Sequence, residues 1–292
     1  MSFLNFGLSF LFLLTLVACQ SAPTKVYETQ PVIKKTNIVI TSKTVIIDAR
    51  PAFDYSLSHM NGSIPMRWEE FSEHDIPYRG LLEMDLFTLT RRLARYGISL
   101  DTPIVVVGRG PQGEGEEGRV AWTLQVLGIR QVQFANINAF SLPLTRLESP
   151  PKVSVPMWKP QVVESLRVDR SEFVYRNVPK ITAQQNNIES AIVIDVRTEA
   201  EYLGKDTKSP YSKSAPHINA INIPWTQFFD KYDNINTEIS SRLEQVGISK
   251  NKIIYVIDNF GVRSAAVTLA LRQLGYSKAA NFAGGYMQLV GK

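Results

Sequence analysis

The segment YVIDNFGVRSA (255–265) joins an apolar run to a helix-forming stretch through a short loop that contains glycine. The run 253–257 has the length and composition of a strand that is buried on both faces. After the loop, apolar side chains recur at helical spacing, and Gly275 supplies the left-handed residue that commonly ends a helix. A further short strand is expected at 279–282. Strand, loop, helix and strand in this order predict a parallel α/β unit. The expected helical face contains Val262, Ala265, Ala266, Leu269, Ala270 and Leu274.

The same order of elements occurs earlier in the chain. TVIIDAR (44–50) and AIVIDVR (191–197) are β-branched runs that both end in Asp-x-Arg. A second apolar run at 104–107 precedes a glycine-rich loop, a helix-forming stretch that ends at Gly128, and an expected strand at 132–135. The helix-forming stretch places Val120, Leu124 and Leu127 on one face. We therefore expect two copies of one α/β unit.

The composition excludes several classes of protein. Of 292 residues, 44% are hydrophobic and 20% are charged, so the chain is too apolar for a disordered protein. Its net charge of +5 is spread along the chain, and no basic run of the kind that binds nucleic acid is present. The single cysteine excludes an intramolecular disulfide and a cysteine-based zinc cluster. The sequence predicts no cofactor and no metal site.

The position of that cysteine, Cys19, predicts a membrane anchor. Residues 3–18 are almost wholly apolar, as in the core of a secretory signal peptide, although no Lys or Arg precedes them. The sequence LVAC (16–19) resembles the bacterial lipobox, in which the cysteine receives a lipid and becomes the new N-terminus. An uncleaved hydrophobic anchor is the alternative. Gln20 follows in place of the aspartate that retains lipoproteins at the inner membrane of enteric bacteria. We therefore expect a lipid-anchored protein of the bacterial cell envelope, at the outer membrane and facing the periplasm.

These features predict five segments. Residues 1–18 form a lipoprotein signal peptide, and the polar residues 19–36 form a flexible tether. The first α/β domain covers 37–142 and the second covers 180–292. Between them, residues 143–179 hold six of the 16 prolines, which predicts an extended connection.

The later copy resembles the rhodanese family. The motifs that carry the resemblance are IVIDVRTEAEYLG (192–204), PHINAINIPW (216–225), YVIDNFGVRSA (255–265) and LGYSKAANFAGGYMQL (274–289), in the order of that domain's landmarks. IIDARPAFDYSLSHMNGSIPMRW (46–68) and IVVVGRG (104–110) look like a second, more diverged module. The resemblance implies two rhodanese-like domains, each a mostly parallel sheet flanked by helices. This tandem arrangement is similar to that of thiosulfate sulfurtransferases.

The resemblance also identifies the loop that carries the family's chemistry. In an active rhodanese, a cysteine at the end of a strand begins a Cys-x-x-x-x-Arg loop, whose backbone N–H groups hold the thiolate and a persulfide intermediate. The corresponding residues here are Asp258, Asn259, Phe260, Gly261, Val262 and Arg263. The spacing to Arg263 is kept, but a carboxylate cannot store sulfur as a persulfide. In the earlier copy ten residues separate Gly108 from Arg119, and this acidic loop is not expected to form a compact anion site.

Two interpretations of Asp258 remain open. The carboxylate is either a nucleophile, as in enzymes that form an aspartyl phosphate, or it fills its own loop through hydrogen bonds and an ion pair with Arg263. The second is expected to be the more common case. No magnesium ligands are evident near the loop.

Other polar and aromatic residues are given structural roles. His59 and His217 are expected to make hydrogen bonds, and Trp68 and Trp225 to anchor the packing. The two Asp-x-Arg pairs are expected to form local ion pairs, with Arg197 facing a cleft as the alternative. The acidic loop 114–117 is expected to be a solvated surface, with partner docking as the alternative.

From these observations we expect a catalytically inactive binding or structural module that takes an envelope protein or a small anion. The alternative is an enzyme, either a sulfurtransferase that uses a thiol from elsewhere or a phosphotransferase or hydrolase built on Asp258.

Overall fold

The computed structural model describes residues 35–147, 153–177, 190–206 and 218–290. Residues 35–292 group into one compact unit. Within the described ranges, no helix is long and apolar enough to cross a membrane. The segment around Cys19 and the residue His217 lie outside these ranges.

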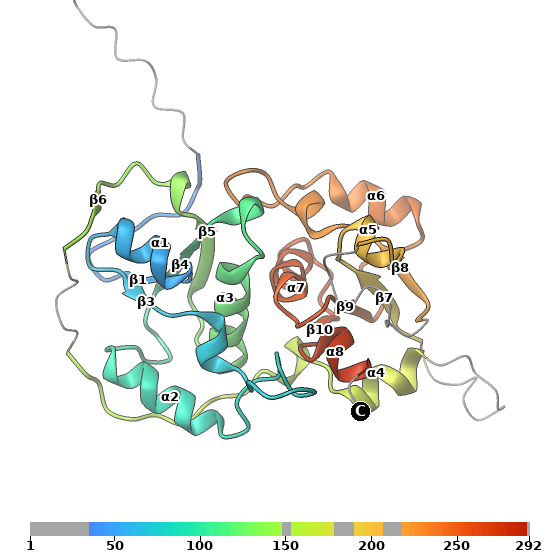
Figure 1. Ribbon diagram of the computed structural model, residues 1–292, viewed down its shortest axis with the longest axis horizontal. Coiled ribbons are helices and arrows are strands. Elements are labelled where there is room, and N and C mark those ends of the chain that lie inside the picture. Colours follow the sequence, from blue (N-terminus) through green and yellow to red (C-terminus); the bar gives the residue numbers. More distant parts are fainter. Residues whose placement is uncertain (1–34, 148–152, 178–189, 207–217, 291–292) are drawn as a thin grey trace, which may run out of the picture. The chain divides into compact units, whose positions relative to one another are not determined.

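Two four-stranded parallel sheets form the framework (Figure 1). The first has the strand order β3-β1-β4-β5, and the second has the order β8-β7-β9-β10. Their strands are β1 (Val45–Asp48), β3 (Ile64–Pro65), β4 (Ile104–Gly108), β5 (Val132–Asn136), β7 (Ile192–Asp195), β8 (Ala220–Asn222), β9 (Ile254–Ile257) and β10 (Ala279–Asn281). The identical order confirms the duplication. We call the part of the chain with the first sheet repeat 1 and the part with the second sheet repeat 2.

Four helical elements occur in the same order in both repeats, and the remaining ones differ. Repeat 1 has α1 (Ala52–Leu57), η1 (Trp68–Phe71), α2 (Leu86–Arg95), η2 (Gly110–Gln112), α3 (Glu116–Val126) and η3 (Ile137–Ala139). Repeat 2 has α5 (Glu199–Tyr202), η6 (Trp225–Phe228), α6 (Ile239–Gln245), α7 (Arg263–Gln273) and α8 (Gly285–Val290). A small antiparallel pair, β2 (His59–Met60) and β6 (Leu144–Thr145), lies outside the sheets.

Alternation along the strands shows that both sheets are buried on both faces. In repeat 1, Ile104 and Val106 belong to one apolar cluster, and Val105 belongs to another. In repeat 2, Ile254 and Tyr255 likewise belong to two different apolar clusters. The cluster with Ile104 and Ile254 includes side chains of α3 and α7, so the two repeats share one continuous core. Burial on both faces explains why the strands are unbroken apolar runs.

The predicted helix ends are confirmed. Gly128 and Gly275 follow the last turns of α3 and α7 with φ of 98° and 93°, a conformation that costs a side chain energy but costs glycine none.

The segment between the repeats is extended over residues 153–163, where two of its prolines lie, but not over its later part. It contains the short turn η4 (Glu164–Leu166) and the helix α4 (Arg170–Asn177). Phe173 of α4 is fully buried and stacks on Phe282, with ring centroids 4.3 Å apart. Val168 donates its backbone N–H to Asn281 O at 3.1 Å. Apolar side chains therefore bind this segment to repeat 2, although the predicted domain boundaries themselves stay a prediction.

The contact between α3 and α7 depends on a glycine. A Cβ placed on Gly118 would lie 2.3 Å from Cβ and 2.7 Å from Cα of Ala266, so Gly118 packs directly against Ala266. The helical conformation of Gly118 does not itself require glycine. Glycine is required here only because α3 approaches Ala266 of α7 so closely.

We predict that Gly118→Ala lowers the free energy of unfolding, measured by urea titration. Helix propensity alone would make this change stabilising by about 1 kcal/mol, but overpacking a rigid contact costs about 1–3 kcal/mol. Ser241→Ala, at an exposed position of α6, is the control and is expected to change stability by less than about 0.5 kcal/mol. A Gly118→Ala chain that is as stable as the natural chain would contradict the close contact.

Candidate functional site

The carboxylate of Asp258 occupies the loop between β9 and α7. Its Oδ1 accepts a short hydrogen bond from the backbone N–H of Gly261, and its Oδ2 accepts one from that of Arg263 at 2.9 Å. The Ser264 hydroxyl lies 3.1 Å from Oδ1. The Arg263 guanidinium is 3.6 Å from Oδ2, and Asp258 is only 2% exposed. The structure thus places this carboxylate inside its own loop, as the second interpretation of the sequence describes.

Gly261 is required by the shape of this loop. Its φ is +76°, and a Cβ would lie 2.2 Å from the backbone oxygen of Ala283. A left-handed residue here turns the loop N–H groups inward, which is how such loops form anion sites. The backbone N–H groups that could bind an anion instead donate their hydrogen bonds to the Asp258 carboxylate.

Arg263 is held by a second carboxylate. Its Nη1 and Nη2 donate to the two oxygens of Glu201 at 2.8 and 2.9 Å. Glu201 also closes the capping box of α5 by accepting the backbone N–H of Thr198 at 2.9 Å. Burial raises the pKa of Glu201, but hydrogen bonds and charge from Arg263, with the Thr198 cap, outweigh it and lower the pKa to about 2. Arg263 therefore carries no uncompensated charge toward a ligand.

Arg119 of repeat 1 reaches across to this loop. It is fully buried in α3, and its Nη1 donates to Gly261 O at 2.8 Å. Its Nη2 donates to Ser72 Oγ at 3.1 Å and makes a short bond to Gly80 O. Burial lowers the pKa of Arg119 to about 10, and the charge of Asp258 opposes this shift. The arginine that the sequence assigned to the loop of repeat 1 thus braces the loop of repeat 2.

The expectation that 114–117 is a solvated acidic surface is wrong for its last two residues. Glu116 and Glu117 form the first turn of α3 and are 7% and 1% exposed. Glu116 pairs with Arg109 through a short hydrogen bond, and its other oxygen accepts the N–H of Glu114 at 2.8 Å. The positive end of the helix and these donors stabilise the buried carboxylate of Glu116.

Both repeats place a carboxylate over the end of the central strand. Sheet pairing aligns Val107 with Asp48 and Ile257 with Asp195, so Gly108 and Asp258 are equivalent positions. A Cβ on Gly108 would lie 1.7 Å from Oε2 of Glu117. The Glu117 carboxylate therefore occupies, from the helix side, the space that the Asp258 side chain fills in repeat 2.

A second buried carboxyl group, Asp233, lies beside Glu117. It belongs to the 229–235 hairpin of repeat 2, has φ of 65° and is 5% exposed. Asn136 of repeat 1 anchors this hairpin by donating to Tyr232 O at 3.3 Å and to Lys231 O at 3.0 Å. Neither Asp233 oxygen accepts a hydrogen bond from a described donor. Burial raises the pKa of Asp233 to about 7, with the neighbouring Glu117 carboxyl group opposing this shift and the charges of Asp230 and Glu116 adding to it. Burial and Asp233 raise the pKa of Glu117 well above its usual range.

The Asp-x-Arg pairs have the predicted local role. Arg50 and Arg197 each bind the carboxylate two residues earlier through Nε and Nη2, with Nη2 to Oδ2 distances of 2.8 Å. Arg197 is 1% exposed and lies 3.8 Å from the centre of the Tyr286 ring. It faces the core, and the alternative in which it faces a cleft is wrong.

The remaining predicted residues either make structural contacts or line a cavity. His59 Nδ1 and Nε2 lie 2.9 Å from the carbonyl oxygens of Tyr55 and Leu147, as a structural histidine does. Trp225 is buried, whereas Trp68 is half-buried and lines a cavity. No group of three or more His, Cys, Asp or Glu side chains among the described residues is arranged to hold a metal ion.

That cavity, which we call the loop cleft, lies over the 258–263 loop and has a volume of about 610 Å³. Its walls come from both repeats and include the aromatic rings of Trp68 and Phe260. Six carboxylates and three arginines line it, so the cleft carries excess negative charge. The charged residues are Glu69, Glu114, Glu116, Glu201, Asp206 and Asp258, with Arg79, Arg109 and Arg263. Such a lining repels dianions such as thiosulfate.

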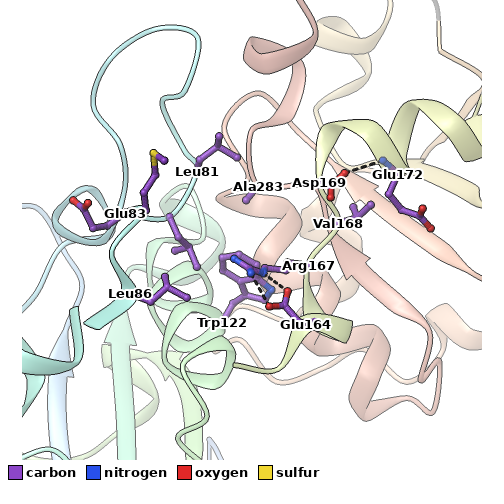
Figure 2. Close-up of a pocket in the computed structure, with 12 residues that line it drawn as sticks. Leu81, Glu83, Leu86, Trp122, Glu164, Arg167, Val168, Asp169, Glu172 and Ala283 are labelled. Atoms are coloured by element: carbon purple, nitrogen blue, oxygen red, sulfur yellow. Dashed lines mark hydrogen bonds and ion pairs between the residues drawn. The ribbon is translucent and has the colours of Figure 1, made fainter. Parts of the chain in front are cut away.

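A different cavity, of about 450 Å³, is shown in Figure 2. Leu81 and Leu86 of repeat 1 line one side of it, and Trp122 donates its Nε1–H to Leu166 O of the 164–172 segment at 3.0 Å. Its one arginine, Arg167, binds both oxygens of Glu164 at 2.7 and 2.8 Å. None of the predicted site residues lines this cavity, so it is separate from the loop cleft.

Sequence reasoning found the Asp258–Arg263 loop but missed its partners. Thr198 and Glu201 have the spacing of a capping box, a signal that predicts the start of α5. No local signal indicates that Glu201 then binds Arg263, that Arg119 reaches the loop of repeat 2, or that Glu117 lies beside Asp233.

Comparison with known proteins agrees with this geometry. Residues 179–292 match the model of the rhodanese-like domain. The thiosulfate sulfurtransferase of Azotobacter vinelandii is 27% identical over 182 residues, which cover 60% of this chain and 62% of that enzyme, less than two thirds of its length. The thiosulfate sulfurtransferase of Pseudomonas aeruginosa is 25% identical over 261 residues, which cover 84% of this chain and 87% of the relative.

Solved structures show the same fold. SseA of Escherichia coli, a 3-mercaptopyruvate sulfotransferase, superposes with a TM-score of 0.64 and 22% identity over 84% of this chain and 93% of its own. EanB in complex with ergothioneine gives a TM-score of 0.69 at 15% identity and covers 87% of this chain and 63% of its own. The chain has the rhodanese fold, and its distant sulfurtransferase relatives support a place in the rhodanese family.

We predict that stability falls as pH rises from 5 to 8, and that Asp233→Asn reduces this fall by about 2 kcal/mol. A carboxyl group whose folded pKa is about 7 releases its proton at lower pH in the unfolded chain, so the free energy of unfolding decreases as pH rises toward 7. Asparagine keeps the left-handed turn and cannot ionise. Urea unfolding at the two pH values measures the difference. Asp101→Asn, at an exposed position, is the control, and equal pH slopes in all three chains would contradict the buried pair.

Proposed function

On the premise that the chain has the rhodanese fold and distant sulfurtransferase relatives, we propose that it is a binding module without sulfurtransferase activity. The observation that carries this proposal is the Asp258 carboxylate, which takes the loop N–H groups that would otherwise hold a thiolate and its persulfide. A carboxylate oxygen has no means of accepting and storing sulfane sulfur. Residues 35–292 contain no cysteine that could replace it.

We also propose that Cys19 carries a lipid and holds the protein in the bacterial cell envelope, at the outer membrane and facing the periplasm. The support is the sequence LVAC (16–19) after an apolar segment. Anchoring would place both repeats where envelope proteins are the available partners.

The charge of the loop cleft indicates the chemistry of such a partner. Carboxylates outnumber arginines in its lining, and Trp68 and Phe260 add aromatic surface. Basic side chains of a protein satisfy both features through ion pairs and cation–π contacts. The partner of the loop cleft is therefore a protein segment that presents Lys or Arg.

An enzyme built on Asp258 is the weaker candidate. Both oxygens already accept backbone hydrogen bonds, and attack on phosphorus would require these bonds to break. The neighbouring Arg263 is neutralised by Glu201, so it offers little attraction for a phosphate.

We predict that the purified chain does not transfer sulfur from thiosulfate to cyanide, and that Asp258→Cys gains a persulfide. The new thiolate would receive the loop N–H groups that now bind the carboxylate. Mass spectrometry after incubation with thiosulfate is expected to show the addition of one sulfur atom, while turnover stays low because the loop cleft repels the dianion.

Asp258→Ser is the matched control, because it has the same shape as the cysteine variant and no thiol. Turnover by the natural chain would overturn the proposal. A cysteine variant that gains no sulfur would mean that the loop does not support a thiolate. The proposal that Asp258 takes the loop N–H groups that would otherwise hold a thiolate would then be wrong.

We predict that Glu69→Lys reduces the capture of partners in cross-linking from envelope extracts. The change adds positive charge at the rim of the loop cleft, where the partner presents its own. Glu238→Lys, an exposed position outside this lining, is the control. Equal capture by both variants, or capture no greater than background by the natural chain, would count against a protein partner at this site.

A further inference from the structure

A third cavity, of about 460 Å³, lies at the carboxyl ends of the strands of repeat 1. Arg50 follows β1, Arg109 follows β4 and Asn136 ends β5, and all three line this cavity. Lys231 and Tyr232 of the 229–235 hairpin of repeat 2 complete the wall. We call this cavity the basic pocket.

The basic pocket has the opposite charge to the loop cleft. Two arginines and one lysine line it, and no carboxylate does so. The polar residues between them, among them Gln112 and Asn138, supply neutral hydrogen-bonding groups. In a parallel α/β sheet, the carboxyl ends of the strands are where ligands bind.

Each cation keeps donor capacity for a ligand. Arg50 uses Nε and Nη2 on Asp48 and Ser58, and its Nη1 donates to no residue that the structure describes. Arg109 pairs with Glu116 through Nη2, and its Nη1, which lies 4.0 Å from Asp54 Oδ2, donates no hydrogen bond to a residue that the structure describes. Lys231 forms no ion pair with a described residue, and its ammonium group lies 5.1 Å from the Tyr232 ring.

A fourth cation lies at the edge of the pocket. The ammonium group of Lys35 donates to Asn138 O at 3.3 Å and lies 5.5 Å from the Tyr232 ring. Lys35 and Lys231 therefore flank the same tyrosine. Convergent cations with unfilled donor positions attract a compact negative group.

We propose that the basic pocket binds a small oxyanion, a phosphate, sulfate or carboxylate group, between Arg50, Arg109 and Lys231. The arginines present planar donors that match such oxygens, and the lysine adds a point charge. The site combines the strand ends of repeat 1 with the 229–235 hairpin of repeat 2 and does not include Asp258. Arg109 is the one residue that lines both this pocket and the loop cleft.

Calorimetric titration of the full chain with inorganic phosphate, at constant ionic strength set with NaCl, tests this assignment. Saturable binding is expected, and Lys231→Gln is expected to raise the Kd about tenfold, as the loss of one charged contact does. Lys252→Gln, an exposed lysine outside the pocket, is the matched control with an unchanged Kd. Both positions are exposed, so neither variant is expected to affect folding.

Parallel titrations with sulfate and acetate identify the preferred group. Tighter binding of phosphate and sulfate than of acetate assigns a tetrahedral dianion, and the reverse order assigns a carboxylate. Heat that does not saturate with any of the three anions would overturn the proposal. So would an equal Kd in the Lys231→Gln and Lys252→Gln chains.

Discussion

The close contact between α3 and α7 determines how the rest of the molecule is arranged. Because Gly118 has no side chain, its backbone rests on Ala266, and the apolar faces of both helices enter one core. At this separation Arg119 reaches Gly261 of the other repeat. The 229–235 hairpin, held by Asn136, likewise reaches the strand ends of repeat 1. The two repeats therefore fold against each other as parts of one body, and each strand-end loop is completed by residues of the other copy.

Within this body, both copies bury a carboxylate where their central strand ends, but they do so from different positions. In repeat 2 the group is Asp258, fully provided with hydrogen bonds from its own loop. In repeat 1 the group is Glu117, which lacks such donors at one oxygen and lies beside Asp233. In the second arrangement, burial raises the pKa of both Glu117 and Asp233, and the neighbouring Asp233 adds to the shift of Glu117. The same backbone plan thus supports two different environments for a buried carboxyl group.

The sequence predicted the parts of this structure that depend on local pattern. β-Branched runs ending in Asp-x-Arg located β1 and β7, and Gly128 and Gly275 located the ends of α3 and α7. The Asp258–Arg263 loop followed from its spacing and its resemblance to a known motif. What local pattern could not show was contact between residues far apart in the chain. Glu117 looked like part of a solvated acidic run, because nothing nearby in sequence indicates that the 229–235 hairpin covers it. The prolines between the repeats predicted the extended residues 153–163, but they gave no sign of α4, whose Phe173 is buried against Phe282.

The hairpins have a further consequence for how the two halves can change. Gly80 in the 72–82 hairpin of repeat 1 touches the loop of repeat 2, and Asp233 in the 229–235 hairpin touches the loop of repeat 1. A hairpin of each repeat therefore covers the strand-end loop of the other repeat. An insertion in one hairpin would reshape the opposite pocket while leaving its own sheet intact. A substitution in either hairpin therefore changes contacts of the opposite repeat, so sequence changes in the two copies are coupled.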